Sequence, residues 1–160
     1  MCGIAGVAGS GSEREVSAVR EMVRAIAHRG PDDRGVWSGE GAVLGNCRLE
    51  IIDLEAGRQP LSNEDGSLWI TFNGEIYNYR ELREGLLERG HELRTHTDTE
   101  VLLHLFEEEG AACLPRLRGM FAFAIWDARR RRLFAARDRF GQKPLFFSRL
   151  GARLVFASEI

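Results

Sequence analysis

Apolar residues recur at helical spacing in three parts of the chain, and each part begins with a residue type common at helix N-termini. The predicted helices cover residues 12–26, 78–90 and 97–110. Ser12 with Glu15, and Thr97 with Glu100, have the spacing of a capping box, in which each side chain accepts the other residue's backbone N–H. Gly90 supplies a stop signal for the second helix, because glycine readily takes the conformation that ends helices.

Eight shorter apolar segments, separated by turn residues, predict β-strands. They cover residues 3–7, 36–37, 42–49, 67–72, 119–127, 132–138, 144–148 and 153–158. Residues 28–35, which contain Pro31, are predicted as a loop. Consecutive strands with short connections favour antiparallel sheets with helices layered outside them. The pattern therefore predicts an α+β fold, and no linker divides the chain into two domains.

Composition and charge agree with a globular protein of the cytoplasm. Hydrophobic residues make up 44% of the 160 residues, charged residues make up 29%, and the net charge is −2. This balance gives no general attraction to nucleic acid or to anionic membranes. No apolar run approaches the roughly 20 residues of a membrane span, and the start lacks the basic-then-apolar order of a secretory signal. We therefore expect a cytoplasmic protein without nucleic-acid or membrane partners.

The cysteines and histidines have spacings that predict neither a disulfide framework nor a metal site. Cys47 and Cys113 are expected to be buried as small apolar residues. The four histidines are His28, His91, His96 and His104. Their spacing, together with that of nearby acids, matches no recognised metal motif.

Cys2 directly follows the initiator methionine, so removal of Met1 would leave a thiol and a free α-amine on one residue. An α-amine titrates near neutral pH and can act as the base for a neighbouring nucleophile. Position 2 also tolerates many small residues, so Cys2 by itself leaves a catalytic and an incidental role open. His28 and Arg29 are candidates for a place near this cysteine or for a structural role in their loop.

The Asn73–Gly74 pair in the segment SLWITFNGEIYNYRE has two interpretations. Asn-Gly favours a tight hairpin turn, although only residues 75–77 would then form the return strand. A strand that ends at this pair could instead present the Asn73 amide and the Gly74 N–H together. Two such donors can stabilise the oxyanion of a tetrahedral acyl intermediate.

Arg48 and Asp98 are candidate ligands for the two charged groups of an α-amino acid. The planar guanidinium of Arg48 could bind a carboxylate through two hydrogen bonds, although most arginines lie on the surface. The carboxylate of Asp98 could bind an ammonium group, although an acid in the first turn of a helix also stabilises the helix dipole.

Eight short segments form an ordered set of motifs. In chain order they are MCGIAG, HRGPDDRG, RLEIIDL, FNGEIYNY, HTDTE, GMFAFAIWD, RDRFGQKPLFF and FASEI. Together they resemble the N-terminal glutaminase domain of glutamine-hydrolysing asparagine synthetases, a class II glutamine amidotransferase of the N-terminal-nucleophile (Ntn) hydrolase superfamily. The resemblance implies one amidotransferase domain over residues 1–160, folded as a four-layer αββα sandwich of two antiparallel sheets flanked by helices.

The resemblance also implies an enzyme that hydrolyses the side-chain amide of L-glutamine to glutamate and ammonia through a Cys2 thioester. The catalytic residues would be Cys2, Asn73 and Gly74. The substrate-binding residues would be Arg48, Leu49, Glu50, Ile51, Ile52, Glu75 and Asp98. Arg48 would hold the substrate carboxylate, and Asp98, helped by Glu75, would hold its ammonium group. Residues 48–52 would line the glutamine pocket.

Further expectations concern cofactors and partners. In the family, a second domain amidates aspartate with ATP and Mg²⁺ through an SGGxDS-type phosphate loop, and no such loop occurs in residues 1–160. We therefore expect no metal or cofactor in this domain, an ATP-dependent synthetase domain or subunit as partner, and a homodimer in the full-length enzyme.

Two positions depart from the family pattern, which commonly has serine at Glu50 and an aliphatic residue at Gln142. An alternative function is a catalytically silent, glutaminase-like module that binds a synthetase partner, although the presence of Cys2 argues against it. A hydrolase of another amide is a further alternative, and the Arg48 and Asp98 pair argues against that.

Overall fold

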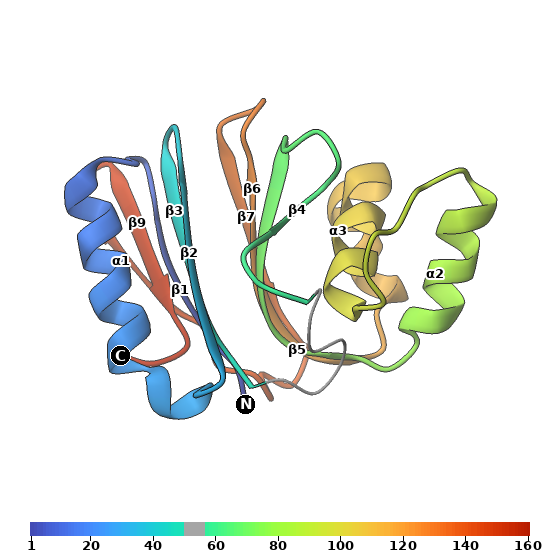
Figure 1. Ribbon diagram of the computed structural model, residues 1–160, viewed down its shortest axis with the longest axis horizontal. Helices are drawn as coiled ribbons and strands as arrows, with labels where there is room; N and C mark the ends of the chain where they lie inside the picture. The colour runs from blue at the N-terminus through green and yellow to red at the C-terminus, as the bar shows by residue number, and fades with distance from the viewer. Residues whose placement is uncertain (50–56) are drawn as a thin grey trace.

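The computed structural model describes residues 1–49 and 57–160, which form two antiparallel sheets packed face to face (Figure 1). The first sheet has the order β2 (Asp33–Gly39), β3 (Ala42–Arg48), β1 (Gly3–Ala8), β9 (Arg153–Ala157) and β8 (Phe146–Leu150). The second sheet has the order β4 (Leu61–Ser62), β5 (Leu68–Ile76), β6 (Gly119–Asp127) and β7 (Arg132–Arg137). Neighbouring strands are antiparallel throughout these ranges.

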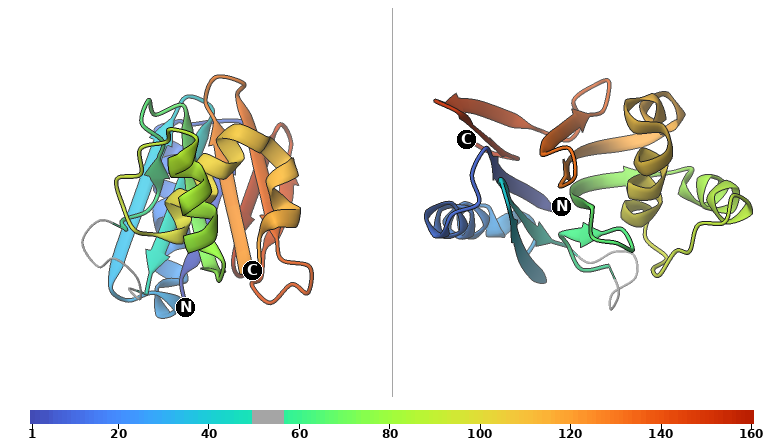
Figure 2. Two further views of the ribbon diagram at one scale, coloured as in Figure 1. Left: turned by 90° about the vertical axis from the view of Figure 1, so that its right-hand side faces the viewer. Right: turned by 90° about the horizontal axis from the view of Figure 1, so that it is seen from above.

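Helices cover the outer faces of both sheets, as the two further views show (Figure 2). They are α1 (Glu13–Ala25), α2 (Tyr79–Glu88) and α3 (Asp98–Glu109), with short 3₁₀ helices η1 (Ala27–Arg29) and η2 (Gly110–Arg116). α1 covers the first sheet, α3 covers the second, and α2 packs outside α3. The predicted αββα sandwich is therefore confirmed. In the described part of the chain, no helix combines the length and the apolar composition that crossing a bilayer requires.

Three apolar clusters fill the spaces between these layers. Between the two sheets, Ile4 and Phe156 of the first sheet share a cluster with Trp126 of the second, and half of the buried members are alanine. Val19 and Val23 of α1 pack against the other face of the first sheet. A third cluster joins the second sheet to α2 and α3, and the first eight residues of α3 are all buried. The position of α3 is therefore fixed by packing on several sides.

The two predicted capping boxes differ in the structure. Thr97 caps α3 by accepting the Glu100 N–H at 3.3 Å, which is one half of the predicted box. The other half does not form, because the Glu100 carboxylate accepts the Arg94 and Thr95 N–H groups instead of that of Thr97. Ser12 stands at the N-cap of α1, but its side chain accepts no backbone N–H there. Its hydroxyl donates instead to the Glu15 carboxylate, which also accepts the Ser10 hydroxyl at 2.9 Å. The box predicted for α1 is therefore wrong, because the side chains bond to each other rather than to the helix backbone.

Two strand segments differ from the prediction, because pairing with a neighbouring strand determines them. Residues 33–35, predicted as loop, belong to β2 and pair with β3. The sequence pattern does not predict β4, whose two residues pair with β5 and are too few to show a period of their own.

Cys47 and Cys113 are buried as predicted. Burial raises the pKa of both thiols, that of Cys113 to about 11.

Asp138 organises the loop that follows β7. Its buried carboxylate accepts the backbone N–H groups of Phe140 and Gln142 at 3.0 Å each. It also accepts those of Lys143 at 3.1 Å and of Phe121 in β6 at 3.2 Å. Burial acts to raise the pKa of this carboxyl, but the four N–H donors together hold it below its usual value. The Gln142 side chain is exposed, so its departure from the family pattern leaves this backbone contact intact.

We expect the change Asp138→Ala to lower the free energy of unfolding by about 2–5 kcal/mol, because it leaves several backbone donors without their acceptor. Denaturant unfolding at neutral pH measures this difference. The control Glu92→Ala removes an exposed carboxylate and should change stability little. Equal effects of the two changes would contradict the role assigned to Asp138.

Candidate active site

A pocket lies where both sheets and the N-terminus of α3 meet. Its lining residues are Cys2, Arg48, Leu49, Gly57, Gln59, Phe72, Gly74, Glu75, Thr97, Asp98 and Thr99. β1 begins one residue after Cys2, and β3 ends at Arg48. β5 contributes Gly74 and Glu75, and α3 begins at Asp98. The fold thus brings together six of the residues singled out in the sequence, from four separate elements.

The Cys2 thiol contacts the backbone of Leu49. The Leu49 N–H donates to Cys2 Sγ at 3.4 Å, and the thiol donates to the Leu49 carbonyl oxygen at 3.7 Å. Cys2 itself is partly exposed, and Met1 in front of it is 56% exposed. Removal of Met1 would therefore leave a free α-amine and an accessible thiol at the edge of the pocket.

Arg29 connects the backbone of Cys2 to residues near position 160. Its Nε donates to the Cys2 carbonyl oxygen at 3.1 Å, and its Nη1 lies 2.8 Å from Glu159 Oε1. The same carboxylate oxygen lies 3.1 Å from His28 Nε2. Arg29 therefore lies close to Cys2, which is one of the two alternatives raised from the sequence, whereas His28 contacts Glu159 rather than the thiol.

β5 continues through the Asn73–Gly74 pair instead of turning there. Asn73 pairs with Ala122 of β6, and Gly74 pairs with Phe121. The hairpin turn and the strand end are therefore both wrong for this pair, because the ladder with β6 overrides the local preference of Asn-Gly. A Cβ atom on Gly74 would lie 2.3 Å from the Met120 carbonyl oxygen, so this register requires glycine.

The Asn73 side chain carries a buried donor. The residue is 1% exposed, and within residues 1–49 and 57–160 its Nδ2 atom has no hydrogen-bond partner. An unpaired buried donor costs about 1–3 kcal/mol, so most proteins avoid it. Asn73 is not among the lining residues of the pocket, although Phe72 and Gly74 on either side of it are. Its amide is therefore a candidate hydrogen-bond donor to a ligand oxygen.

Asp98 is a buried acid that connects α3 to β5. It is 6% exposed, and its Oδ2 atom accepts the Ile76 N–H at 2.9 Å. Burial raises the pKa of the Asp98 carboxyl to about 6, against the N–H donors of Ile76 and Thr99, and the nearby Glu75 charge acts in the same direction as burial. A cation bound beside Asp98 would offset the cost of its buried charge.

The pocket offers charges of both signs. Arg48, 5% exposed, ends β3 and pairs in register with Asp33 of β2. It lines the pocket together with the carboxylates of Glu75 and Asp98. This set of charges is complementary to a ligand that carries both a carboxylate and an ammonium group.

Sequence reasoning missed the role of Gln59, whose side-chain amide joins three elements under the pocket. Its Oε1 accepts the Phe72 N–H of β5 at 2.7 Å and the Asn46 side-chain amide of β3 at 3.2 Å. Its Nε2 donates to Thr99 Oγ1 of α3 at 3.4 Å. Thr97 and Thr99 were also missed as lining residues. The only local signal is a glutamine before Pro60, which carries no motif of its own.

Three predicted pocket residues, Glu50, Ile51 and Ile52, lie outside the residues that the structure describes. The adjoining Arg48 and Leu49 do line the pocket. Within the described ranges, the group of side chains with metal-ligating geometry lies elsewhere and comprises Glu64, His91 and His104.

Comparison with known proteins shows which family the chain resembles. The family described as a glutamine amidotransferase domain matches residues 1–160. Glutamine-hydrolyzing asparagine synthetase 1 of Bacillus subtilis (strain 168) is 46% identical over 165 residues, which cover 99% of this chain and 26% of that protein. Glutamine-hydrolyzing asparagine synthetase 3 of Arabidopsis thaliana is 44% identical over 163 residues, which cover 100% of this chain and 28% of that protein. The chain thus spans about a quarter of the length of these curated relatives.

A solved structure has the same fold. Glutamine phosphoribosylpyrophosphate amidotransferase from B. subtilis, complexed with ADP and GMP, matches with a TM-score of 0.79 and 25% sequence identity. The match covers 98% of this chain and 42% of the other. It supports the assignment of the two-sheet sandwich to the Ntn type.

We expect Asp98 to make stability fall as pH rises. Between about pH 4 and pH 6 the folded protein keeps a proton that the unfolded chain has released, because folding raises the pKa from 3.8 to about 6. The loss that accumulates over this window is on the order of 3 kcal/mol. Asp98→Asn should remove that part of the pH dependence, which denaturant unfolding at about pH 4.5 and pH 7.5 measures.

The matched control for this experiment is Asp65→Asn, which changes an exposed carboxylate. It should keep the pH dependence of the unchanged protein. If Asp98→Asn kept it as well, the carboxyl of Asp98 would not be the group that titrates in this window.

Proposed function

This chain belongs to the glutamine amidotransferase domain family, and we propose that it hydrolyses the side-chain amide of L-glutamine to glutamate and ammonia. The observation that carries the proposal is the position of the Cys2 thiol. It lies at the very start of the chain, on the wall of a pocket that also holds Arg48 and Asp98. An N-terminal nucleophile next to groups that fit an α-amino acid is what such a reaction needs.

The first half of the reaction would form a thioester on Cys2. Once Met1 is removed, the α-amine of Cys2 takes the thiol proton, and Sγ attacks the carbonyl carbon of the glutamine side chain. The carbonyl oxygen gains negative charge, and the Asn73 amide and the Gly74 N–H donate to it. The C–N bond then breaks, the α-ammonium of Cys2 returns its proton to the leaving group, and ammonia departs.

Water completes the cycle. The α-amine accepts a proton from a water molecule that attacks the thioester carbon, and the same two donors stabilise the second oxyanion. Breaking of the C–S bond releases glutamate, and the proton returns to the Cys2 thiolate. No metal or other cofactor is part of this scheme.

Recognition of glutamine would depend on its two α-substituents. Arg48 binds the α-carboxylate through its planar guanidinium. Asp98, helped by Glu75, binds the α-ammonium, which favours the charged form of the Asp98 carboxyl. Leu49, with its backbone against Cys2 Sγ, holds the thiol at the wall of the pocket.

The released ammonia would be used by a partner. The relatives with the names quoted above are glutamine-hydrolyzing asparagine synthetases, and this chain matches about a quarter of their length. We therefore propose that an ATP-dependent synthetase domain or subunit receives the ammonia and amidates aspartate.

Glutamate release from L-glutamine by the mature protein, with its N-terminus confirmed by intact mass, is the direct test. We expect Cys2→Ala to reduce the rate to background, because the nucleophile is lost. Protein that retains Met1 should be equally inactive, because the nitrogen of Cys2 is then part of a peptide bond and cannot accept the thiol proton. The control Cys113→Ala removes a buried thiol outside the pocket and should keep the activity.

A folded, Met-free protein that releases no glutamate even with its synthetase partner would overturn the proposal in favour of a silent binding module. Full activity of Cys2→Ala would exclude Cys2 as nucleophile. Faster turnover of an amide without the α-carboxylate would favour a different amide substrate.

We expect Asn73→Ala to lower kcat by about 10²–10³ while KM changes little, because the amide would act mainly on the oxyanion. Steady-state glutaminase assays separate these two constants. Asn73→Asp keeps the size of the side chain but replaces the donor with an acceptor, and it should be at least as impaired. Unchanged kcat in both variants would remove Asn73 from the oxyanion site.

A further inference from the structure

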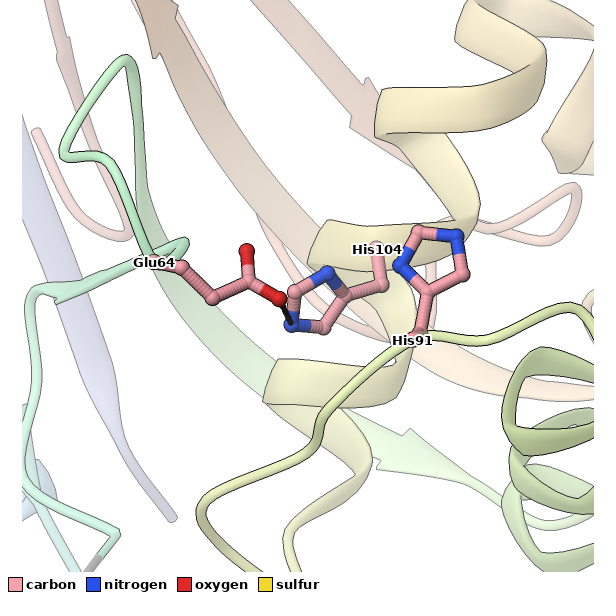
Figure 3. A group of neighbouring side chains, drawn as sticks. All are labelled: Glu64, His91 and His104. Atoms are coloured by element: carbon pink, nitrogen blue, oxygen red, sulfur yellow. Dashed lines mark ion pairs between the residues drawn. The ribbon is translucent and has the colours of Figure 1, made fainter.

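Three side chains that are distant in the sequence meet on the outer side of the second sheet, away from the pocket. Glu64 lies on the turn between β4 and β5, His91 follows α2, and His104 belongs to α3 (Figure 3). One potential ligand atom from each residue lies within 4.8 Å of the other two. None of the three lines the pocket that contains Cys2.

The two imidazoles are largely withdrawn from solvent. The His104 side chain is 1% exposed and that of His91 is 17% exposed, whereas that of Glu64 is 38% exposed. The two rings lie edge to face, with centroids 5.1 Å apart. Glu64 Oε1 lies 3.8 Å from His104 Nε2, too far for a hydrogen bond. The Glu64 carboxylate and the His104 imidazole are therefore neighbours without a hydrogen bond between them.

One ring nitrogen of each imidazole lies within hydrogen-bond distance of a second carboxylate. His104 Nδ1 lies 3.1 Å from Glu107 Oε2, and His91 Nε2 lies 3.0 Å from Glu108 Oε1. The nitrogens that remain are His104 Nε2 and His91 Nδ1. In Figure 3 the His104 ring lies next to Glu64, and the His91 ring lies next to that of His104. A carboxylate on the far nitrogen fixes the orientation of a metal-binding histidine and makes its ligand nitrogen more basic.

The surrounding charges favour a cation. Glu64, Glu107 and Glu108 place three carboxylates around the two rings. Arg89 offsets one of them, since its Nε donates to Glu108 at 2.9 Å. Glu107 is also held in place by the Asn63 side-chain amide at 2.9 Å. The group therefore keeps negative charge next to two nitrogen ligands.

We propose that Glu64, His91 and His104 form a zinc site, with a water molecule as the fourth ligand. Two imidazoles and one carboxylate are a ligand set that zinc accepts, whereas Mg²⁺ and Ca²⁺ prefer oxygen ligands alone. Tetrahedral zinc with bonds of about 2.0–2.1 Å needs ligand atoms about 3.4 Å apart. Glu64 Oε1 and His104 Nε2, which are 3.8 Å apart, are already close to this separation.

Such an ion would tie three segments together. It would join the β4–β5 turn to the segment after α2 and to the middle of α3. The same segment after α2 leads into Thr97 and Asp98, which line the pocket. The site would thus have a structural role, and binding would stabilise the folded protein.

Zinc titration of metal-stripped protein tests the site. The titration uses the Cys2→Ala background, because an N-terminal cysteine is itself a zinc ligand. We expect one zinc ion per chain by calorimetry and elemental analysis, and a higher melting temperature with Zn²⁺ but not with Mg²⁺. Absence of stoichiometric binding, or an equal temperature shift with Mg²⁺, would overturn the proposal.

Variants locate the ion. We expect Glu64→Gln and His104→Gln to lose the zinc-dependent shift, and Glu107→Gln to weaken zinc binding by about 10–100-fold, because it loosens the orientation of His104. The matched control His96→Gln changes an exposed histidine of the same segment outside the group and should bind zinc as the parent does. If His104→Gln fails to fold, Glu64→Gln and His91→Gln test whether zinc binds at this group. Parent-like zinc binding by those variants would show that the ion lies elsewhere.

Discussion

The side-chain amide of Gln59 sets the geometry on which the pocket depends. One oxygen accepts donors from β3 and β5, and one nitrogen donates to α3, so a single buried group links both sheets and a helix. Those three elements carry Arg48, the Asn73–Gly74 pair and Asp98 respectively. Because buried amide hydrogen bonds are costly to leave unmade, the spacing between these groups is held closely.

Two buried polar groups in and beside the pocket are not fully compensated. Asn73 keeps a buried donor without a partner among the described residues, and Asp98 keeps a carboxyl whose charge is disfavoured by burial. Each feature reduces the stability of the free protein, and each would be relieved by a bound ligand. The apolar packing around α3 tolerates this cost, since the first eight residues of the helix are buried on several sides.

The sequence predicted features that depend on contacts between neighbouring residues. It did not predict features that depend on contacts between segments distant in the sequence. The Thr97 cap of α3 involves residues three positions apart, and the pattern predicted it. The Asn73–Gly74 pair has a strong local turn preference, but nine residue pairs with β6 hold the segment extended. The strand pattern predicted antiparallel sheets with helices outside them, and the ordered motifs added the four-layer arrangement. Four of the six pocket residues were already candidates from their chemistry, whereas Leu49 and Glu75 came from the resemblance alone. Gln59 and the His91–His104 contact join separate segments without any motif, so only the folded chain reveals them.

The position of β1 has a consequence for the order in which the site can be assembled. β1 is the central strand of the first sheet, with β3 on one side and β9 on the other. β1 directly follows Cys2, and it gains its second neighbour only after residues 153–157 have been made. Long-range pairing of this kind forms late in folding. A chain that stops before β9 would therefore leave one edge of β1, next to Cys2, without its partner strand.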